Sequence, residues 1–297
     1  MMTHCKFTTR LSNFALILLL SIALLQSCSE KEIVITMDEP ESTAIRVPSD
    51  LPTIQAAVNA AANGDTILVA PGIYKGEGNR DIIIEGKSVV IIAEQDASST
   101  VIDCEGSENE PHRAFVIRNQ ASSNTIIEGF TIRGGYNTSG AAIYCTSASP
   151  TFKFCIFYGN QSTLSGGAIR CKNSSPALIN CTFVANAAKT GGAIFGLASS
   201  SPYLENCIIA FSGSGESIAT ADGSSQPILT CCNIFGNAGG DWERAISDQA
   251  NSKGNLSVDP QFCDPDNLIF SLKTSSPCAP DNNSCGKLIG ALAVECN

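Results

Sequence analysis

The stretch SPTFKFCIFYGN at 149–160 is the first of four similar repeats, and these repeats identify the fold. The later copies read SPALINCTFVAN at 175–186, SPYLENCIIAFS at 201–212 and QPILTCCNIFGN at 226–237. The matching cysteines are separated by 26, 26 and 25 residues, at Cys155, Cys181, Cys207 and Cys232. A fixed period of roughly 20–50 residues indicates a solenoid in which each repeat forms one coil.

The aligned copies separate core positions from corner positions. Cysteine fills position 155 and Phe or Ile fills position 157, so these two positions share one face of a strand. Position 152 is apolar but out of phase with them, which predicts a corner near 153–154, where Asn180 and Asn206 fall in later copies. Position 160 is mostly Asn, for which we expect a left-handed turn and stacked side-chain amides.

A second strand is expected from a glycine-rich pattern that recurs with the same period. It reads GAAIYC at 140–145, GGAIRC at 166–171, GGAIFG at 191–196 and GESIAT at 215–220. A third short strand would complete each coil.

The cysteine columns predict buried thiols rather than disulfides. Stacked coils place equivalent Cα atoms roughly 4.8 Å apart, and parallel side chains keep the Cβ atoms beyond the preferred disulfide spacing of about 3.5–4.5 Å. Cys145 and Cys171 form a second column of this kind. No His or close Cys pair joins the columns, so we predict no metal site.

The start of the fold carries a helix and a resemblance. Residues 51–62 form an amphipathic pattern that Ser49 or Asp50 could cap and Asn63-Gly64 would end. The segments TIQAAVNAAANGDTILVAPGIY at 53–74 and DIIIEGKSVVIIAE at 81–94 resemble the opening of right-handed parallel β-helix proteins of the pectin-lyase-like superfold. In that family the helix plugs the N-terminal end of the solenoid.

Two further patterns bear on the family. The pair of F-x-x-N at Phe157…Asn160 and G-G-A-I at 166–169 resembles the repeats of bacterial polymorphic outer membrane proteins. The run L-x-x-C-x-F-x-x-N at 178–186 also fits a leucine-rich repeat. The Gly-Gly-Ile strand in the return segment and the helical opening at 53–74 favour the β-helix.

We therefore predict an all-β fold, a right-handed parallel β-helix solenoid with an N-terminal capping α-helix and an irregular C-terminal cap. The β-helix would span 46–257, with its clearest repeats at 125–237, and 258–297 would form the closing coil and cap. The cap contains Cys263, Cys278, Cys285 and Cys296. Four cysteines permit three pairings that sequence does not distinguish, and we take Cys278–Cys285 as the working prediction.

The N-terminus has the pattern of a bacterial lipoprotein. An apolar run at 14–25 is too short to span a bilayer comfortably and precedes Leu25-Gln26-Ser27-Cys28, which resembles a lipobox. We predict a signal peptide at 1–27, a lipid anchor on Cys28 and a tether at 28–45. The resemblance implies a bacterial cell-envelope location as an outer-membrane lipoprotein, periplasmic or surface-exposed, with membrane contact through the anchor only.

The composition narrows the function. A net charge of −10 argues against a nucleic-acid partner. The chain has two histidines and no Asp-Asp pair, so we predict no catalytic residues and no cofactor. We expect a non-enzymatic role in adhesion or in binding an extracellular or cell-surface polysaccharide. The alternative, implied by the superfold, is a lyase or hydrolase of acidic polysaccharides, with Ca²⁺ required only for the lyase.

One outward column is the candidate glycan-binding strip. Tyr144, Arg170 and Phe195 follow the Ile of the second strand in successive repeats and should point to solvent. In that order a guanidinium would lie between two aromatic rings. Aromatic strips bind sugars, although outward aromatic residues can also simply shield a sheet.

Overall fold

The computed structural model describes residues 44–119 and 124–297. The predicted signal peptide, the anchor Cys28 and nearly all of the tether at 28–45 lie outside the described residues. Within the described ranges, no helix is long and apolar enough to cross a membrane.

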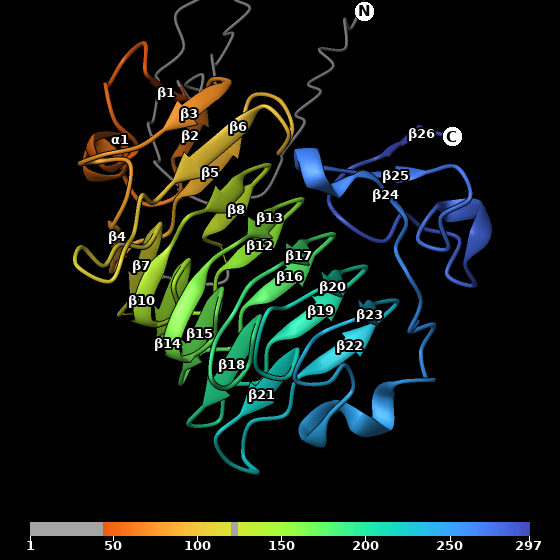
Figure 1. The fold of residues 1–297 in the computed structure, drawn as a ribbon. Helices are drawn as coiled ribbons and strands as arrows, with labels where there is room; N and C mark the ends of the chain where they lie inside the picture. Colours follow the sequence, from red (N-terminus) through yellow and green to blue (C-terminus); the bar gives the residue numbers. More distant parts are fainter. Residues whose placement is uncertain (1–43, 120–123) are drawn as a thin grey trace, which may run out of the picture. The chain divides into compact units, whose positions relative to one another are not determined.

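The described chain winds through three parallel sheets of eight, seven and six strands (Figure 1). The eight-stranded sheet contains β1 (Ile45–Val47), β2 (Thr66–Val69), β5 (Val90–Ala93), β8 (Ile126–Glu128), β12 (Thr151–Lys153), β16 (Ala177–Ile179), β19 (Tyr203–Glu205) and β22 (Ile228–Thr230). The seven-stranded sheet contains β3 (Gly72–Tyr74), β6 (Thr100–Asp103), β9 (Thr131–Arg133), β13 (Ile156–Tyr158), β17 (Thr182–Val184), β20 (Ile208–Ala210) and β23 (Asn233–Phe235).

The third sheet and the smaller elements complete the coils. The six-stranded sheet contains β4 (Ile82–Glu85), β7 (Phe115–Arg118), β11 (Ile143–Thr146), β15 (Ile169–Lys172), β18 (Ile194–Leu197) and β21 (Ile218–Thr220). Strands β10 (Tyr136–Ser139) and β14 (Gln161–Ser165) pair separately. Every neighbouring pair in the three sheets is parallel and one coil apart, as in Phe152↔Leu178, which confirms the predicted parallel β-helix.

The corner between the eight- and seven-stranded sheets lies where the sequence predicts it. Phe154, Asn180, Asn206 and Cys231 all have positive φ angles between 49° and 53°. One left-handed residue at this point turns the chain from β12 into β13 and from each equivalent strand into the next.

The asparagine column stacks as predicted, but it does not form the left-handed turn. Positive φ angles fall one residue earlier, at Gly159, Ala185, Phe211 and Gly236. The side-chain Nδ2 of Asn160 donates to Ile132 O and to Asn186 Oδ1, both at 3.0 Å. Asn160 thus bonds the coil before it and the coil after it, while Asn186 donates to Phe157 O and Asn237 donates to Ile209 O in the coils before them, so the column helps to fix the spacing of the coils.

The glycine pair of the repeat is required by close approach of the coils. Gly166 and Gly191 have φ angles of 66° and 65°, which favour glycine. A Cβ on Gly167 would lie 2.0 Å from the carbonyl oxygen of Gly192. No side chain fits in that space, so the second glycine of the pattern G-G-A-I is needed where the backbones of successive coils touch.

Apolar side chains fill the inside of the coils, and the cysteine columns belong to this core. Cys145, Cys155, Cys171, Cys181, Cys207 and Cys232 are buried and free, as predicted. Phe157 and Phe183, at equivalent positions, stack with ring centroids 4.6 Å apart.

The N-terminal helix is shorter than the predicted span of 51–62. Helix α1 covers Ile54–Ala60, and its cap is Thr53, whose side chain accepts a hydrogen bond from Ala56 N. Asp50 cannot cap it because its carboxylate accepts from Arg46 N at 2.8 Å and stabilises the preceding turn. Ile54, Ala57 and Val58 are buried against the first coil. At the other end, η1 (Arg244–Gln249) lies against β21 and β22 and buries Ile246.

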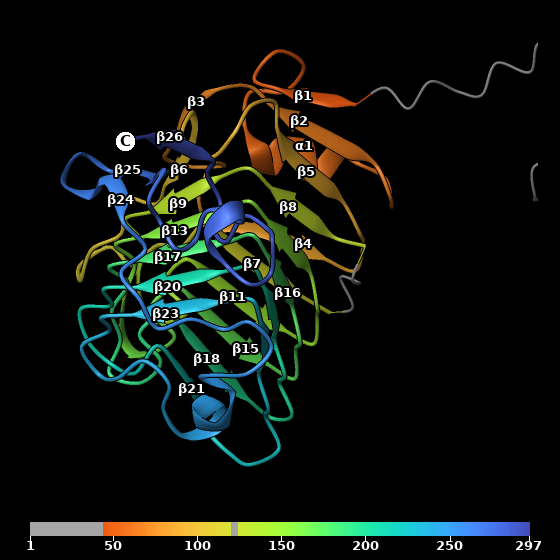
Figure 2. The same ribbon diagram turned by 90° about the vertical axis from the view of Figure 1, so that its right-hand side faces the viewer.

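Residues 258–297, the C-terminal segment, cover the side of the solenoid rather than its end. The segment contains β24 (Phe262–Asp264), η2 (Pro265–Asn267), β25 (Ile269–Lys273), η3 (Pro280–Asn282) and β26 (Val294–Cys296). These elements lie beside the seven-stranded sheet (Figure 2). A second core forms there, with solenoid residues such as Ile156 and Ile208 against Phe270, Leu272 and Ile289.

The predicted pairing of Cys278 with Cys285 is wrong. Disulfides join Cys231 to Cys285 and Cys263 to Cys296, while Cys278 is free and buried. The segment folds back along the solenoid, so Cys285 meets a corner residue of the last repeat instead of its neighbour in sequence.

We expect Gly167→Ala to lower the free energy of unfolding by about 3 kcal/mol, because overpacking must push two coils apart. Urea denaturation measures the effect. Gly223→Ala is the matched control, since nothing lies within 4 Å of a Cβ there, and it should change stability by less than about 0.5 kcal/mol. Equal effects of the two substitutions would contradict the close contact.

Alkaline pH should weaken the fold through the buried thiols. Burial raises the pKa of Cys171 to about 12, whereas an unfolded thiol has a pKa near 8.5. The stability from this group is complete below the unfolded pKa and is lost as pH rises from about 8.5 toward 12, by about 1.4 kcal/mol per pH unit. Urea midpoints between pH 8 and about 10 should therefore fall less steeply in Cys171→Ala than in the parent. Parallel pH profiles would refute this.

Candidate functional site

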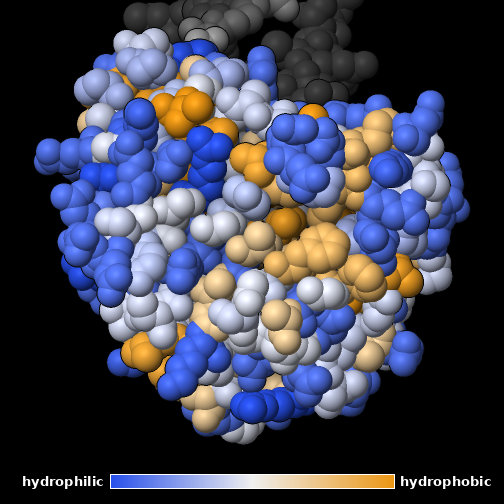
Figure 3. All heavy atoms as spheres, viewed as in Figure 1, coloured by the Kyte–Doolittle hydropathy of each residue, from blue (hydrophilic) through white to orange (hydrophobic). Residues whose placement is uncertain are grey.

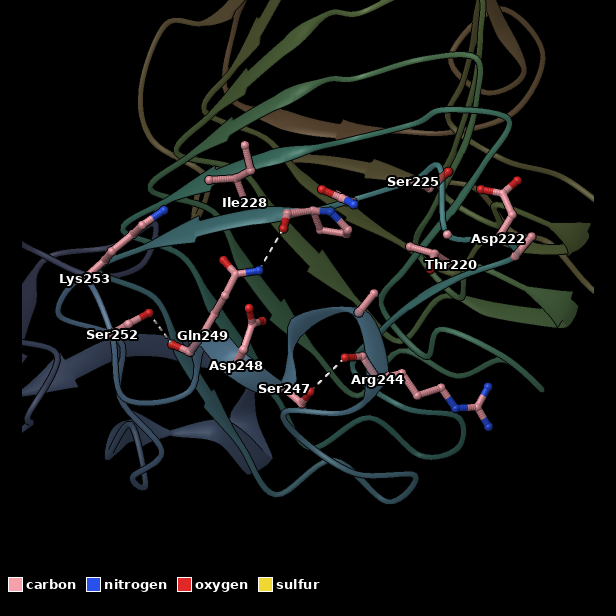
Figure 4. Close-up of a pocket in the computed structure, with 15 residues that line it drawn as sticks. Thr220, Asp222, Ser225, Ile228, Arg244, Ser247, Asp248, Gln249, Ser252 and Lys253 are labelled. Carbon is pink, nitrogen blue, oxygen red and sulfur yellow. Dashed lines mark hydrogen bonds between the residues drawn. The ribbon is translucent and has the colours of Figure 1, made fainter.

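A cleft of about 790 Å³ lies at the closed C-terminal end of the solenoid (Figure 4). Two of its polar side chains, those of Gln249 and Asp222, are already used in hydrogen bonds that hold this end together. Gln249 donates to Pro227 O and accepts from Leu229 N, both at 2.9 Å. Asp222 accepts from Ser224 and from Ala198 N, which lowers its pKa. We assign this cleft to closure of the coil by η1.

The outer face of the six-stranded sheet contains the predicted strip. Tyr144 pairs in register with Arg170 on the next strand, and Arg170 pairs with Phe195 on the one after. Tyr144 and Arg170 are half-buried, whereas Phe195 is only 9% exposed. The three side chains therefore share one column, but Phe195 contributes little surface.

Tyr144 is flanked by two arginines instead of the predicted arginine between two rings. The guanidinium carbon of Arg170 lies 5.5 Å from the centre of the Tyr144 ring. The guanidinium carbon of Arg113, from the preceding coil, lies 5.3 Å from the same centre. These distances place the two guanidinium carbons within about 11 Å of each other, and each cation is attracted to the ring.

Neither arginine forms a salt bridge with a carboxylate in the part of the chain that the structure describes, although Asp81, which accepts from Arg113 N at 3.1 Å, interacts electrostatically with the Arg113 guanidinium. Arg113 donates to the carbonyl oxygen of Ser139 at 3.1 Å, and its burial lowers the pKa of its guanidinium. The Nε of Arg170 is buried and has no hydrogen-bond partner among the described residues. Leaving a buried donor unpaired costs about 1–3 kcal/mol, so the arrangement is poorly explained by stability.

The two guanidiniums open into a cleft of about 300 Å³, which we call the arginine–tyrosine cleft. Its lining is Arg113, Val116, Asn137, Thr138, Ser139, Tyr144 and Arg170. Strand β10 supplies the Asn, Thr and Ser of this lining, so polar residues line the cleft together with the aromatic ring. A ligand with an apolar face and hydrogen-bonding edges matches this lining.

Further positive charge lies on the same sheet. Lys172 is exposed two residues after Arg170 and has no ion pair among the described residues. Arg118 is paired with Glu85 at 2.8 Å. The face thus carries an excess of positive charge in a protein whose net charge is −10, which favours an anionic ligand here.

The sequence pattern identified two of these groups and missed a third. Tyr144 and Arg170 were in the predicted strip, but Arg113 was not, because it precedes β7 in a coil whose repeat alignment is broken by the acidic insertion. The signal that could have found it is its place in the preceding coil, three residues before Val116, which is the in-register partner of Tyr144. In residues 44–119 and 124–297, no three His, Cys, Asp or Glu side chains form a group that could hold a metal ion.

Comparison with known proteins identifies a family. A family model described as "Right handed beta helix region" matches residues 88–257. No curated protein matches the sequence. Solved structures that match include a pectin methylesterase in complex with a hexasaccharide, with 17% identity, a TM-score of 0.45, and coverage of 63% of this chain and 66% of that one.

Two other solved structures are similarly distant. A mutant pectin methylesterase in complex with a hexasaccharide has 13% identity and a TM-score of 0.36, with 67% of this chain and 80% of that one covered. A pectate lyase has 13% identity and a TM-score of 0.38, with 62% and 58% covered. The match spans less than two thirds of the first methylesterase and of the lyase.

We expect the side chain of Arg170 to lower the free energy of unfolding of the protein rather than to raise it. We expect Arg170→Met to leave the free energy of unfolding unchanged or to raise it by up to about 1 kcal/mol, because the unpaired Nε is removed. Arg133→Met is the matched control, since Arg133 is paired with Asp103 at 3.0 Å, and it should lower stability by about 1–2 kcal/mol. Urea denaturation compares them, and a larger loss for Arg170→Met would show that Arg170 is structural.

Proposed function

The chain belongs to the right-handed β-helix family, and we propose that it binds an anionic polysaccharide on the outer face of its six-stranded sheet. The observation that carries this proposal is the Tyr144 ring flanked by the guanidiniums of Arg113 and Arg170, neither of which forms a salt bridge with a carboxylate among the described residues. Both guanidiniums are therefore available to pair with the negative groups of a ligand.

The chemistry of the cleft matches a charged sugar. The apolar face of a sugar ring can stack on Tyr144, as other apolar groups do on aromatic rings. A guanidinium binds a carboxylate or sulfate through two parallel hydrogen bonds, which a lysine cannot do. Two guanidiniums no more than about 11 Å apart suit a polymer that carries its negative charges at regular intervals.

We also propose where the protein does this. Lipidation at Cys28 would tether the solenoid to a bacterial cell envelope as an outer-membrane lipoprotein, with the acyl chains as its membrane contact. The role would then be adhesion to, or retention of, a polysaccharide at the cell surface or in the periplasm, without cleavage.

Cleavage of acidic polysaccharides remains the alternative prediction. No specific observation among the described residues favours it over binding. An ultraviolet assay for unsaturated uronates, with polygalacturonate and Ca²⁺, distinguishes the two, since a lyase releases products that absorb and a binding protein does not.

Calorimetric titration of the protein with polygalacturonate, dextran sulfate and neutral galactan tests the proposal. We expect the two anionic polymers to bind, galactan not to bind, and affinity to fall with added salt. Arg170→Gln and Tyr144→Ala should each weaken binding about tenfold or more, the loss expected when one charged or aromatic contact is removed.

Tyr203→Ala is the matched control, because Tyr203 is an exposed, outward-facing tyrosine on the eight-stranded sheet. It should leave the affinity unchanged. Binding of the anionic polymers that persists at full strength in Arg170→Gln and Tyr144→Ala would rule out the arginine–tyrosine cleft as the site.

A further inference from the structure

A second surface, on a different sheet, is hollowed and apolar. Between the seven-stranded sheet and the C-terminal segment lies a cleft of about 290 Å³, which we call the junction cleft. Its apolar lining includes Val101, Ile156, Tyr158, Leu268, Ile269 and Leu292. On this face hydrophobic residues gather around a hollow beside the C-terminal segment (Figure 3).

The junction cleft lies where one column of the sheet changes from covered to uncovered. Residues Ile73, Val101, Thr131, Ile156, Thr182 and Ile208 are successive partners along the outer face of the sheet. The last three are about 1% exposed because the C-terminal segment covers them, whereas Ile73 is 60% exposed. The column, which is apolar except at Thr131 and Thr182, therefore continues beyond the part that the C-terminal segment covers.

The covered part of the column, Ile156 to Ile208, shows what kind of chain packs on this face, because the C-terminal segment lies there. There the solenoid holds the apolar chain at 288–292 through its backbone as well as its side chains. Asn180 Nδ2 donates to Leu288 O at 2.7 Å, and Ala291 N donates to Thr182 Oγ1 at 2.9 Å. The occupant is thus a short apolar stretch of polypeptide, bonded at its main chain. Thr131 lies two strands before Thr182 in the same column, so the uncovered part of the column also carries a hydroxyl that could accept a hydrogen bond from a main-chain N–H.

Charge at the junction cleft favours a basic occupant. The cation of its lining, Arg133, is already paired with Asp103 at 3.0 Å. Glu295 also lines the cleft and is exposed, with no ion pair among the described residues. Asp266, which precedes the lining residue Asn267, is exposed as well. A second copy of this chain would bring the same acidic groups, so like charges oppose self-association here.

An exposed leucine lies at the edge of the junction cleft. Leu268 ends η2 with a left-handed φ angle of 62°, its backbone N–H donates to Pro265 O, and its side chain is 39% exposed. Glycine adopts this conformation more easily, so Leu268 adds an apolar side chain to the cleft at a position that glycine could fill.

We infer that the junction cleft and the uncovered column from Ile73 to Thr131 bind a partner protein through a short polypeptide segment that alternates apolar and basic side chains. The apolar side chains continue the packing made by the C-terminal segment. The basic side chains pair with Glu295 and Asp266 at its edge. This surface is separate from the arginine–tyrosine cleft and prefers the opposite charge.

Fluorescence anisotropy of the full protein with labelled octapeptides tests this inference. The probes are alternating Lys-Val, Glu-Val and Lys-Ser peptides. We expect saturable binding of Lys-Val, with Glu-Val and Lys-Ser each weaker by about tenfold or more, because one loses charge complementarity and the other the apolar contact. Ile73→Ser and Glu295→Gln should each weaken Lys-Val binding about tenfold.

Ile228→Ser is the matched control, since Ile228 is 43% exposed on the eight-stranded sheet, and it should leave the affinity unchanged. Leu268→Gly removes the side chain while relieving the backbone, so it should weaken binding in a protein at least as stable as the parent. Equal affinity for Glu-Val, or unchanged affinity in Ile73→Ser, would overturn the inference. So would a dimer in sedimentation that Ile73→Ser dissolves, because a second copy would then be the occupant.

Discussion

Hydrogen bonding between equivalent positions of successive coils determines where every strand and corner of the solenoid can lie. Each strand must satisfy its backbone groups on the strands one coil before and one coil after it. A coil of 25 or 26 residues can do so only if its corners recur at the same places. Asn160 and Asn186, bonded to each other and to backbone carbonyls, and the glycine contact at Gly167 enforce that recurrence.

The same constraint separates structural residues from functional ones. Inward and corner positions must repeat, because every coil uses them in the same way. Outward positions do not have to repeat, and those on the six-stranded sheet do not: one column passes from Val116 to Tyr144, Arg170 and Phe195. The binding site that we propose is therefore made of residues that break the repeat, and three successive coils bring Arg113 and Arg170 to the ring of Tyr144.

The sequence predicts the coils well because their signals recur. The cysteine columns and the corner at Asn180 and Asn206 follow from four aligned copies, and one copy alone would not define them. The left-handed turn was misplaced because its true position is filled by Gly159, Ala185, Phe211 and Gly236, which share no side-chain type. Repetition reveals a structural role only where one residue type serves it best.

Single features were harder to predict. The cover formed by the C-terminal segment, and its disulfide to Cys231, depend on a long-range contact that no period encodes. Arg113 was missed for a similar reason, since an insertion separates it from the aligned repeats. Both errors concern residues whose neighbours in space lie in other coils and outside the repeating columns.

A crystal structure of the protein with an oligosaccharide of polygalacturonate would show whether the arginine–tyrosine cleft binds an anionic polysaccharide. We expect a sugar ring on Tyr144, with carboxylate oxygens about 2.7–2.9 Å from the guanidinium nitrogens of Arg113 and Arg170. An oligosaccharide bound at full occupancy elsewhere on the solenoid, with the arginine–tyrosine cleft empty, would contradict this expectation.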